Sequence, residues 1–198
     1  ARENPNINIL SDEIYELILK KEFEHYSLSS LANDLKDRIF IINGFAKGWA
    51  MTGWRIGYLV GPKDVIKASS ALQSQSTSNV CSFVQKGALE ALKINNDFFS
   101  MINSHYDQRR SLLYEGLKSI NGIYIKEPNG AFYAFPKLPN SSITSVDFCN
   151  KALQDYGLVV VPGKAFGADE CIRMSCAASE IKIKDGLQRL EKAIFKYY

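Results

Sequence analysis

The sequence predicts a mixed fold of strands and helices, arranged in two layers or more, of the α/β or α+β class. Short runs of β-branched and aromatic residues alternate with longer stretches whose apolar residues recur at helical spacing. Glycine, proline and asparagine separate most of these segments. The 198 residues suffice for one large domain or two small ones.

The first half of the chain carries three of the expected strands. The elements in chain order are a strand at 6–10, a short surface helix at 28–36, strands at 38–43 and 54–62, and helices at 63–75 and 80–94. The first strand stops at a polar pair, so its end carries Asp12. A hydroxyl-rich segment, 76–79, separates the two helices.

The second half begins with a long helix that Asn95 to Asp97 can cap. Its elements are a helix to about residue 120, short runs at 123–128 and 131–135 around a turn at 128–130, a helix after Ser145, strands at 158–163 and 171–177, and a last helix from Ser179. Gly122 and Gly157 provide helix stops. The break near residue 97 is the predicted domain boundary.

Composition narrows the class of function. The net charge of +3 arises from 24 basic and 21 acidic residues without a run of one sign, so nucleic-acid or membrane-surface binding has no support. No apolar stretch approaches the ~20 residues of a membrane span, and the start lacks a signal-peptide pattern. The four cysteines show no CxxC spacing, and with two histidines they favour reduced, packed thiols in a cytoplasmic protein rather than a metal site.

Two cations stand in the apolar stretch 46–58, AKGWAMTGWRIGY. Lys47 between small and aromatic residues is partly desolvated, and a neutral amine is a nucleophile toward a carbonyl carbon. The alternative is a surface lysine at a turn. Arg55 falls in a run that reads as buried strand, so it requires an anion, either a ligand or a carboxylate in an ion pair.

Three further residues are candidates for a site. Asp12 ends a strand, where sheets of this class build their sites; the alternative is a simple cap that accepts backbone N–H bonds at the start of the next segment. Tyr15 follows three residues later. Arg173 lies in an apolar strand as its only cation. Two such arginines and the lysine together suit a small ligand with several negative charges.

Four segments resemble those of the fold-type I aminotransferases that use pyridoxal phosphate, in particular the prokaryotic-type aspartate aminotransferase branch. They are SDEIYE at 11–16, AKGWAMTGWRIGYLVGP at 46–62, NGAFY at 129–133, and VVVPGKAFG with CIRMSCAASE between 159 and 180. Their order and gaps resemble those of the family over essentially the whole chain. The resemblance implies that 1–97 is the second half of the large cofactor domain, with a mostly parallel sheet, and that 98–198 is a small α+β C-terminal domain.

The resemblance also implies a role for each candidate residue. Lys47 forms the internal aldimine with the cofactor and then moves the proton, while Asp12 pairs with the pyridinium nitrogen and keeps it protonated. Tyr15 donates to the phenolic oxygen. Arg55 binds the cofactor phosphate and Arg173 the substrate α-carboxylate, both as bidentate contacts.

The resemblance also bears on the subunit contact, on two positions that depart from the family pattern and on the length of the chain. The hydroxyl-rich segment 76–79 is similar to one that approaches the phosphate of the neighbouring subunit, which implies a homodimer. Many relatives carry a serine where this chain has Gly44 or Ala46. The chain also corresponds to the second half of such an enzyme, so we expect it to be a C-terminal fragment that is inactive alone and binds the cofactor weakly or not at all.

The sequence thus predicts transamination between an amino acid, with aspartate favoured, and 2-oxoglutarate. One alternative keeps the cofactor and changes the chemistry to a C–S lyase or another elimination. A second alternative is the aminotransferase-like sensor domain of a transcription regulator, which would carry a DNA-binding module upstream. The expected partners are amino-acid and 2-oxo-acid substrates and a second subunit, with no metal, nucleic acid or membrane.

Overall fold

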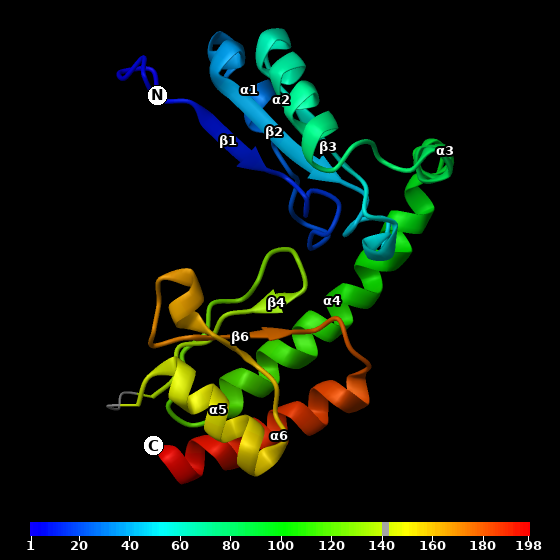
Figure 1. Cartoon of the computed structure of the whole chain (residues 1–198). Coiled ribbons are helices and arrows are strands. Elements are labelled where there is room, and N and C mark those ends of the chain that lie inside the picture. The colour runs from blue at the N-terminus through cyan, green and yellow to red at the C-terminus, as the bar shows by residue number, and fades with distance from the viewer. Residues whose placement is uncertain (140–142) are drawn as a thin grey trace. The chain divides into compact units, whose positions relative to one another are not determined.

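A computed structural model describes residues 1–139 and 143–198 of the chain (Figure 1). Contacts within the chain divide it into two compact units, Ala1–Met101 and Ile102–Tyr198. Each unit has its own three-stranded sheet and its own helices. The units are described separately below.

The sheet of the N-terminal unit has the order β1-β2-β3. Its strands are β1 (Ile9–Asp12), β2 (Ile39–Gly44) and β3 (Gly57–Val60). The pair β1 and β2 is parallel, with Asp12 opposite Ile42, whereas β2 and β3 are antiparallel. The carboxyl ends of β1 and β2 therefore lie at the same edge of the sheet, and both strand ends lead into candidate residues.

Helices surround this sheet in the order that periodicity predicts. They are α1 (Leu28–Leu31), the 3-10 segments η1 (Asn33–Arg38) and η2 (Thr52–Trp54), α2 (Lys63–Ser76), α3 (Ser82–Ala91) and the start of α4 (Asn96–Ser119). The expected helix at 28–36 is thus two short pieces, with Ala32 between them at φ −132°. The core of the unit consists of two small clusters, one around Ile39 and Ile41 and one around Phe45 and Met51.

The C-terminal unit has an antiparallel sheet of order β4-β6-β5. Its elements are the rest of α4, β4 (Tyr133–Ala134), α5 (Ser145–Tyr156), β5 (Val161–Pro162), the 3-10 segment η3 (Gly163–Phe166), β6 (Ile172–Ser175) and α6 (Glu180–Tyr197). A single apolar cluster joins these helices to the sheet, and Phe148, Leu117 and Leu190 at its centre are fully buried.

Most of the predicted caps and stops are found at the helix ends for which they were predicted. Asn95 accepts a hydrogen bond from the Phe98 amide (3.4 Å), Ser179 caps α6, and Gly122 and Gly157 adopt positive φ. One cap is displaced: Thr144, not Ser145, is the N-cap of α5 and accepts from the Asp147 amide. Ser145 is instead buried in the first turn, where its hydroxyl donates to Asp169.

The strand expected at 54–62 is shorter than its apolar run. Arg55 has φ 54° in the left-handed region, and regular strand begins only at Gly57. The Trp54 ring packs against the backbone of Gly87 in α3, where an added Cβ would lie 2.3 Å from it. That packing holds residues 52–55 as a tight turn instead of extended chain. No helix in the described part of the chain has the length and apolar character needed to cross a membrane.

Candidate active site

The loop after β1 carries the first two candidate residues. Asp12 is exposed at the strand end, and its Oδ1 accepts a hydrogen bond from the Ile14 amide at 3.2 Å. This hydrogen bond is the local cap that the sequence offered as the alternative to a functional role, and the residue remains exposed. Tyr15 lies in the turn that follows and is half-buried.

Lys47 lies in the connection between β2 and β3 and is half-buried. Its Nζ is 5.7 Å from the centroid of the Tyr15 ring, within the range of a cation–π contact. The connection is closed at its base, because the Phe45 amide donates to the Ile56 carbonyl (3.4 Å) and the Met51 amide to the Phe45 carbonyl (3.1 Å). The fold therefore brings the lysine amine and the phenol together at the edge where β1 and β2 end.

Arg55 stands at the other end of the same connection but is exposed, so the expectation of a buried arginine is wrong. Its Nη1 donates to the Thr52 carbonyl at 2.9 Å. The expectation failed because the apolar run around it suggested extended strand, whereas the tight turn at 52–55 points the side chain outward. The side chain is exposed, and an exposed guanidinium is accessible to an anionic ligand.

Arg173 belongs to the C-terminal unit, on β6 opposite Val161. Its guanidinium carbon lies 4.4 Å from the Tyr133 ring centroid and 4.5 Å from that of Phe166. The half-buried cation is thus held between two aromatic faces. Such stacking orients the planar fork while leaving its edge N–H groups for a carboxylate.

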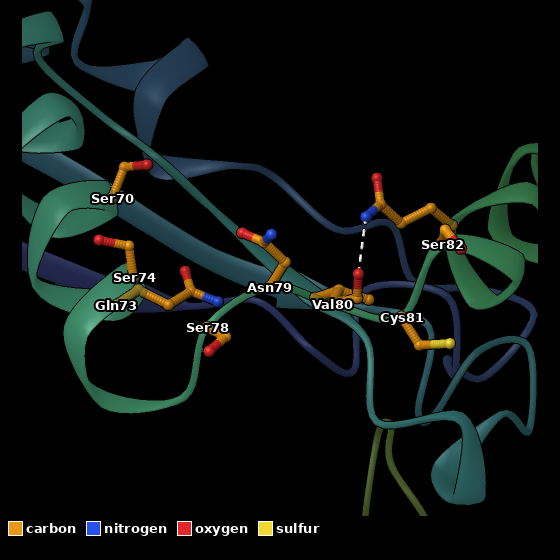
Figure 2. Close-up of a pocket in the computed structure, with 9 residues that line it drawn as sticks. Ser70, Gln73, Ser74, Ser78, Asn79, Val80, Cys81 and Ser82 are labelled. Atoms are coloured by element: carbon orange, nitrogen blue, oxygen red, sulfur yellow. Dashed lines mark hydrogen bonds between the residues drawn. The ribbon is translucent and has the colours of Figure 1, made fainter.

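The hydroxyl-rich segment 76–79 borders a pocket of about 600 Å³ between the end of α2 and the start of α3 (Figure 2). Ser78 has φ 60°, and the Gln85 side chain donates to the Val80 carbonyl at 2.8 Å. The pocket is lined mainly by hydroxyl and amide groups, those of Ser70, Gln73, Ser74, Ser78 and Asn79 among them. It offers hydrogen-bond donors to a polar group and no charge of its own among these five residues.

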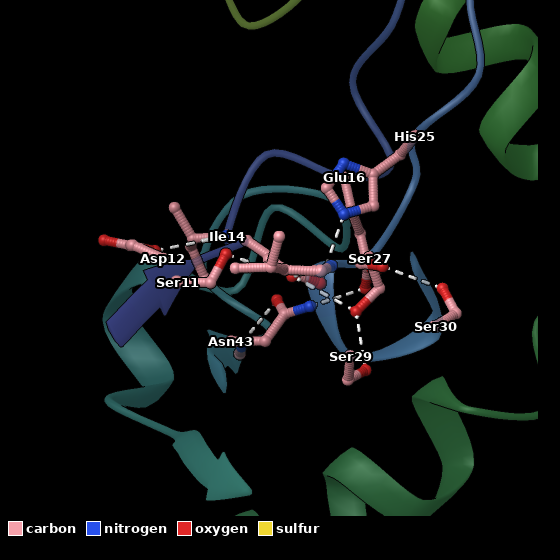
Figure 3. A network of polar contacts seen from close by, with 12 residues as sticks. Ser11, Asp12, Ile14, Glu16, His25, Ser27, Ser29, Ser30 and Asn43 are labelled. Atoms are coloured by element: carbon pink, nitrogen blue, oxygen red, sulfur yellow. Dashed lines mark hydrogen bonds and ion pairs between the residues drawn. The ribbon is translucent and has the colours of Figure 1, made fainter. Parts of the chain in front are cut away.

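Three polar residues near the site, Glu13, Glu16 and Asn43, were not anticipated from the sequence. Glu13 is buried, and its carboxylate accepts hydrogen bonds from Ser11, Ser27 and the Leu28 amide, each at 3.1 Å (Figure 3). His25 Nε2 lies 3.1 Å from its other oxygen.

The charge of Glu13 follows from those contacts. Burial acts to raise the pKa of this carboxyl, but the hydrogen bonds from His25, the Leu28 amide and the two hydroxyls outweigh it, so its pKa lies below the usual value. Glu16 and Asn43 are the other two residues that were not anticipated.

The sequence held one signal for them: Asn43 is a polar residue at the end of an otherwise apolar strand.

Comparison with known proteins assigns the chain to a class. The aspartate aminotransferase from Rhizobium meliloti has a crystal structure that matches 98% of the chain with a TM-score of 0.91 and 36% sequence identity. The Thermus thermophilus aspartate aminotransferase with maleate matches 95% of it with a TM-score of 0.86 and 38% identity. The mixed α/β fold is therefore that of the pyridoxal-phosphate-dependent transferases.

The particular family follows from the sequence match. Residues 1–190 match aminotransferase class I and II, and the chain belongs to that family. A probable aspartate/prephenate aminotransferase of Rickettsia typhi is 40% identical over 202 aligned positions, which cover 97% of this chain and 51% of that protein. The chain thus spans about half the length of the curated relatives it matches, and of the two solved structures it covers 51% and 48%.

Family members use pyridoxal phosphate, and the groups found here fit it chemically. The cofactor has an aldehyde, a phenolic oxygen, a ring nitrogen and a phosphate. At the edge of the N-terminal sheet the chain presents a primary amine beside a phenol, and an exposed carboxylate. An exposed guanidinium stands in the connection that carries the amine.

Proposed function

We propose that this chain is part of a pyridoxal-phosphate-dependent aminotransferase and carries its reactive lysine. The proposal depends chiefly on one observation: Lys47 Nζ stands over the Tyr15 ring, at the sheet edge where Asp12 ends β1. The Lys47 amine is half-buried between a strand end and a phenol. Partial shielding from water favours the neutral amine, which is the form that attacks a carbonyl carbon. When bound, pyridoxal phosphate supplies that carbonyl and a ring that accepts electron density.

Each candidate residue of the N-terminal unit has a role in this proposal. The Lys47 amine would hold the cofactor through its aldehyde carbon, and the same amine would serve as the base that moves a proton at the substrate α-carbon. The Asp12 carboxylate holds the ring nitrogen protonated, because an ionised neighbour favours the cationic form. The Tyr15 hydroxyl donates to the phenolic oxygen, and the Arg55 guanidinium binds the phosphate.

Substrate binding falls to Arg173 in the proposal. Its guanidinium is already oriented between Tyr133 and Phe166, so a bidentate contact with an α-carboxylate costs little further side-chain entropy. We propose aspartate as amino donor and 2-oxoglutarate as acceptor, since one relative is named for aspartate and prephenate and another was solved with maleate, a dicarboxylate.

We further propose residues 1–97 as the second half of the cofactor-binding large domain and 98–198 as the small domain of a cytoplasmic homodimer. The segment 76–79 supports the dimer, because it borders a hydroxyl-lined pocket and would approach the cofactor phosphate of the partner subunit. On this proposal the present chain by itself is inactive and binds the cofactor weakly or not at all.

The test is replacement of Lys47 by alanine in a protein with the full length of the relatives. Transamination and the visible absorbance of the lysine–cofactor adduct should both disappear, while a Lys36→Ala control, at an exposed lysine of η1, keeps both. Turnover by the Lys47→Ala protein would show the assignment to be wrong. Product analysis, with a new amino acid rather than ammonia, separates transamination from elimination.

A further inference from the structure

The loop that follows β1 contacts the segment that leads to Lys47 at several successive positions. The Glu13 amide donates to the Ile42 carbonyl at 2.9 Å, and the Glu16 carboxylate accepts from the Asn43 side chain at 2.6 Å. Further along, Leu17 packs on Gly48, and the Tyr15 ring lies under Lys47 Nζ. The two segments therefore run against each other on either side of the two candidate groups.

Asn43 is the centre of this contact and is almost fully buried, with 4% of its surface exposed. Its Nδ2 donates to Glu16, and its Oδ1 accepts from the Gly44 amide at 2.7 Å (Figure 3). Because both ends of the amide are used, the side chain has one orientation. The bond from Nδ2 joins the end of β2 to the loop, and the bond to the Gly44 amide fixes the side chain that makes it.

Gly48 fixes the distance between the two segments beyond Lys47. A Cβ at this position would lie 2.9 Å from the Leu17 Cβ and 2.8 Å from its Cδ1. Non-bonded carbon atoms do not approach each other this closely, so the loop can lie here only because residue 48 has no side chain. Lys47 is thus flanked by a hydrogen-bonded contact before it and a steric contact after it.

Glu13 holds the opposite side of the loop. Its buried carboxylate is surrounded by donors from Ser11, Ser27, His25 and the Leu28 amide. Oxygen and nitrogen atoms of Glu13, Glu16 and His25 lie within 4.8 Å of one another, a spacing that a metal ion could use. The donors already saturate Glu13, however, and a cation would have to displace them, so this cluster is organised as a structural support.

We propose that Glu16 and Asn43 are positioning residues, which act through the loop to hold the Tyr15 phenol and the Lys47 amine at a fixed separation. The inference depends on the proposed function, since the separation matters only if both groups act on one ligand. Positioning of reacting groups supplies a large share of catalytic rate, and a displacement of about 1 Å is costly. Neither side chain needs to touch cofactor or substrate.

The experiment compares four variants of a protein with the full length of the relatives, in which the proposed function requires cofactor binding. Glu16→Ala removes the acceptor, Glu16→Gln keeps an acceptor oxygen for Asn43, and Asn43→Asp replaces the donor by a second acid. Glu24→Ala is the matched control, because Glu24 is an exposed glutamate near the same loop whose hydrogen bond is to Tyr26. Circular dichroism first verifies that each variant is folded.

Two readouts follow. Amide hydrogen exchange of residues 12–17 and 43–48 reports whether the two segments open together. Reduction with borohydride in the presence of pyridoxal phosphate makes each lysine adduct permanent, so mass spectrometry measures the trapping rate at Lys47 relative to the other lysines even when binding is weak. The second readout is specific for the position of one amine, which general destabilisation does not change selectively.

We expect Glu16→Ala and Asn43→Asp to raise exchange in both segments together and to lower relative trapping at Lys47 about tenfold, the effect of losing one charge-assisted hydrogen bond. Glu16→Gln should restore most of both, and Glu24→Ala should change neither. Unchanged trapping in folded Glu16→Ala, or failure of Glu16→Gln to rescue, overturns the positioning inference alone. A wild-type protein of this full length that traps Lys47 no faster than its other lysines overturns the proposed function instead, and the positioning role falls with it.

Discussion

The two units of the chain are organised by different kinds of interaction. Among the residues that the structure describes, the C-terminal unit has one apolar cluster of sixteen buried residues, whereas the N-terminal unit has two clusters of four. The described part of each unit also buries two polar side chains, Glu13 and Asn43 in the N-terminal unit and Arg110 and Ser145 in the C-terminal unit, so hydrogen-bonded polar groups make up a larger share of the smaller core. The comparison indicates that stability resides mainly in one unit and the geometry of the candidate lysine site in the other.

The largest expected effect tests where apolar stability resides. Phe148→Ala in α5 removes a fully buried ring from the large cluster and should cost about 3–5 kcal/mol. Phe45→Ala, in a cluster of four that can relax toward solvent, should cost less than half of that. Denaturant unfolding with hydrogen exchange resolved by segment measures both.

The chain provides a convenient separate probe of the N-terminal unit. Both of its tryptophans, Trp49 and Trp54, lie there. Tryptophan fluorescence should therefore report the loss of stability caused by Phe45→Ala. The loss caused by Phe148→Ala should be measured by hydrogen exchange and circular dichroism. Equal losses for the two phenylalanine variants would contradict the contrast between one large core and two small ones.

The second prediction concerns acid. The folded-state pKa of Glu13 is lowered, so its ionised form stabilises the N-terminal unit. That contribution is complete above the unfolded pKa, which is about 4.3 for glutamate, and is lost as the pH falls through the lower folded pKa. Tryptophan fluorescence should show the N-terminal unit unfolding in this window.

Glu13→Gln removes that titration. It should cost about 1–2 kcal/mol at pH 7, because charge-assisted hydrogen bonds become neutral ones, and it should flatten the acid dependence. The same scan on Glu24→Gln, at an exposed position, serves as the control. An acid transition of the tryptophan signal that is identical in wild type and Glu13→Gln would mean that other carboxyls govern it.

The same contrast explains how far the sequence could predict the structure. Local signals were sufficient where one residue determines a backbone choice: Asn95 and Ser179 cap helices, and Gly122 and Gly157 end them with positive φ. The strand end at Asp12 is likewise local, because a polar residue stops an apolar alternation. These positions needed no knowledge of distant parts of the chain.

Prediction failed where a distant contact decides the outcome. Arg55 is exposed in a left-handed turn because Trp54 packs on Gly87, which is more than thirty positions away in the sequence. Glu13 and Asn43 become buried only through partners that the fold supplies. Lys47 and Tyr15 nevertheless lie close together, 5.7 Å from Nζ to ring centroid, although they come from two separate motifs; the roles of both residues stay predictions.

A smaller effect distinguishes how the two units use hydroxyl groups at helix starts. Thr144 accepts from the Asp147 amide at 3.1 Å and caps α5, so Thr144→Ala should cost about 1 kcal/mol. Ser27 is the N-cap residue of α1 but makes no capping bond, because its hydroxyl donates to Glu13. Ser27→Ala should therefore raise exchange around Glu13 rather than only in α1.

The smallest expected effect concerns surface charge. Glu90 and Lys93 in the N-terminal unit form an ion pair at 2.7 Å, with about 70% of each side chain exposed. Solvent screens such a pair, and Glu90→Gln should change stability by less than about 0.5 kcal/mol, a difference that disappears in 1 M salt. A larger loss, measured by tryptophan fluorescence, would mean that this unit depends on its surface charges as well as on Glu13. The contrast between the units would then be one of charge rather than of buried hydrogen bonds, and the acid transition would have to be reassigned to several carboxyls acting together.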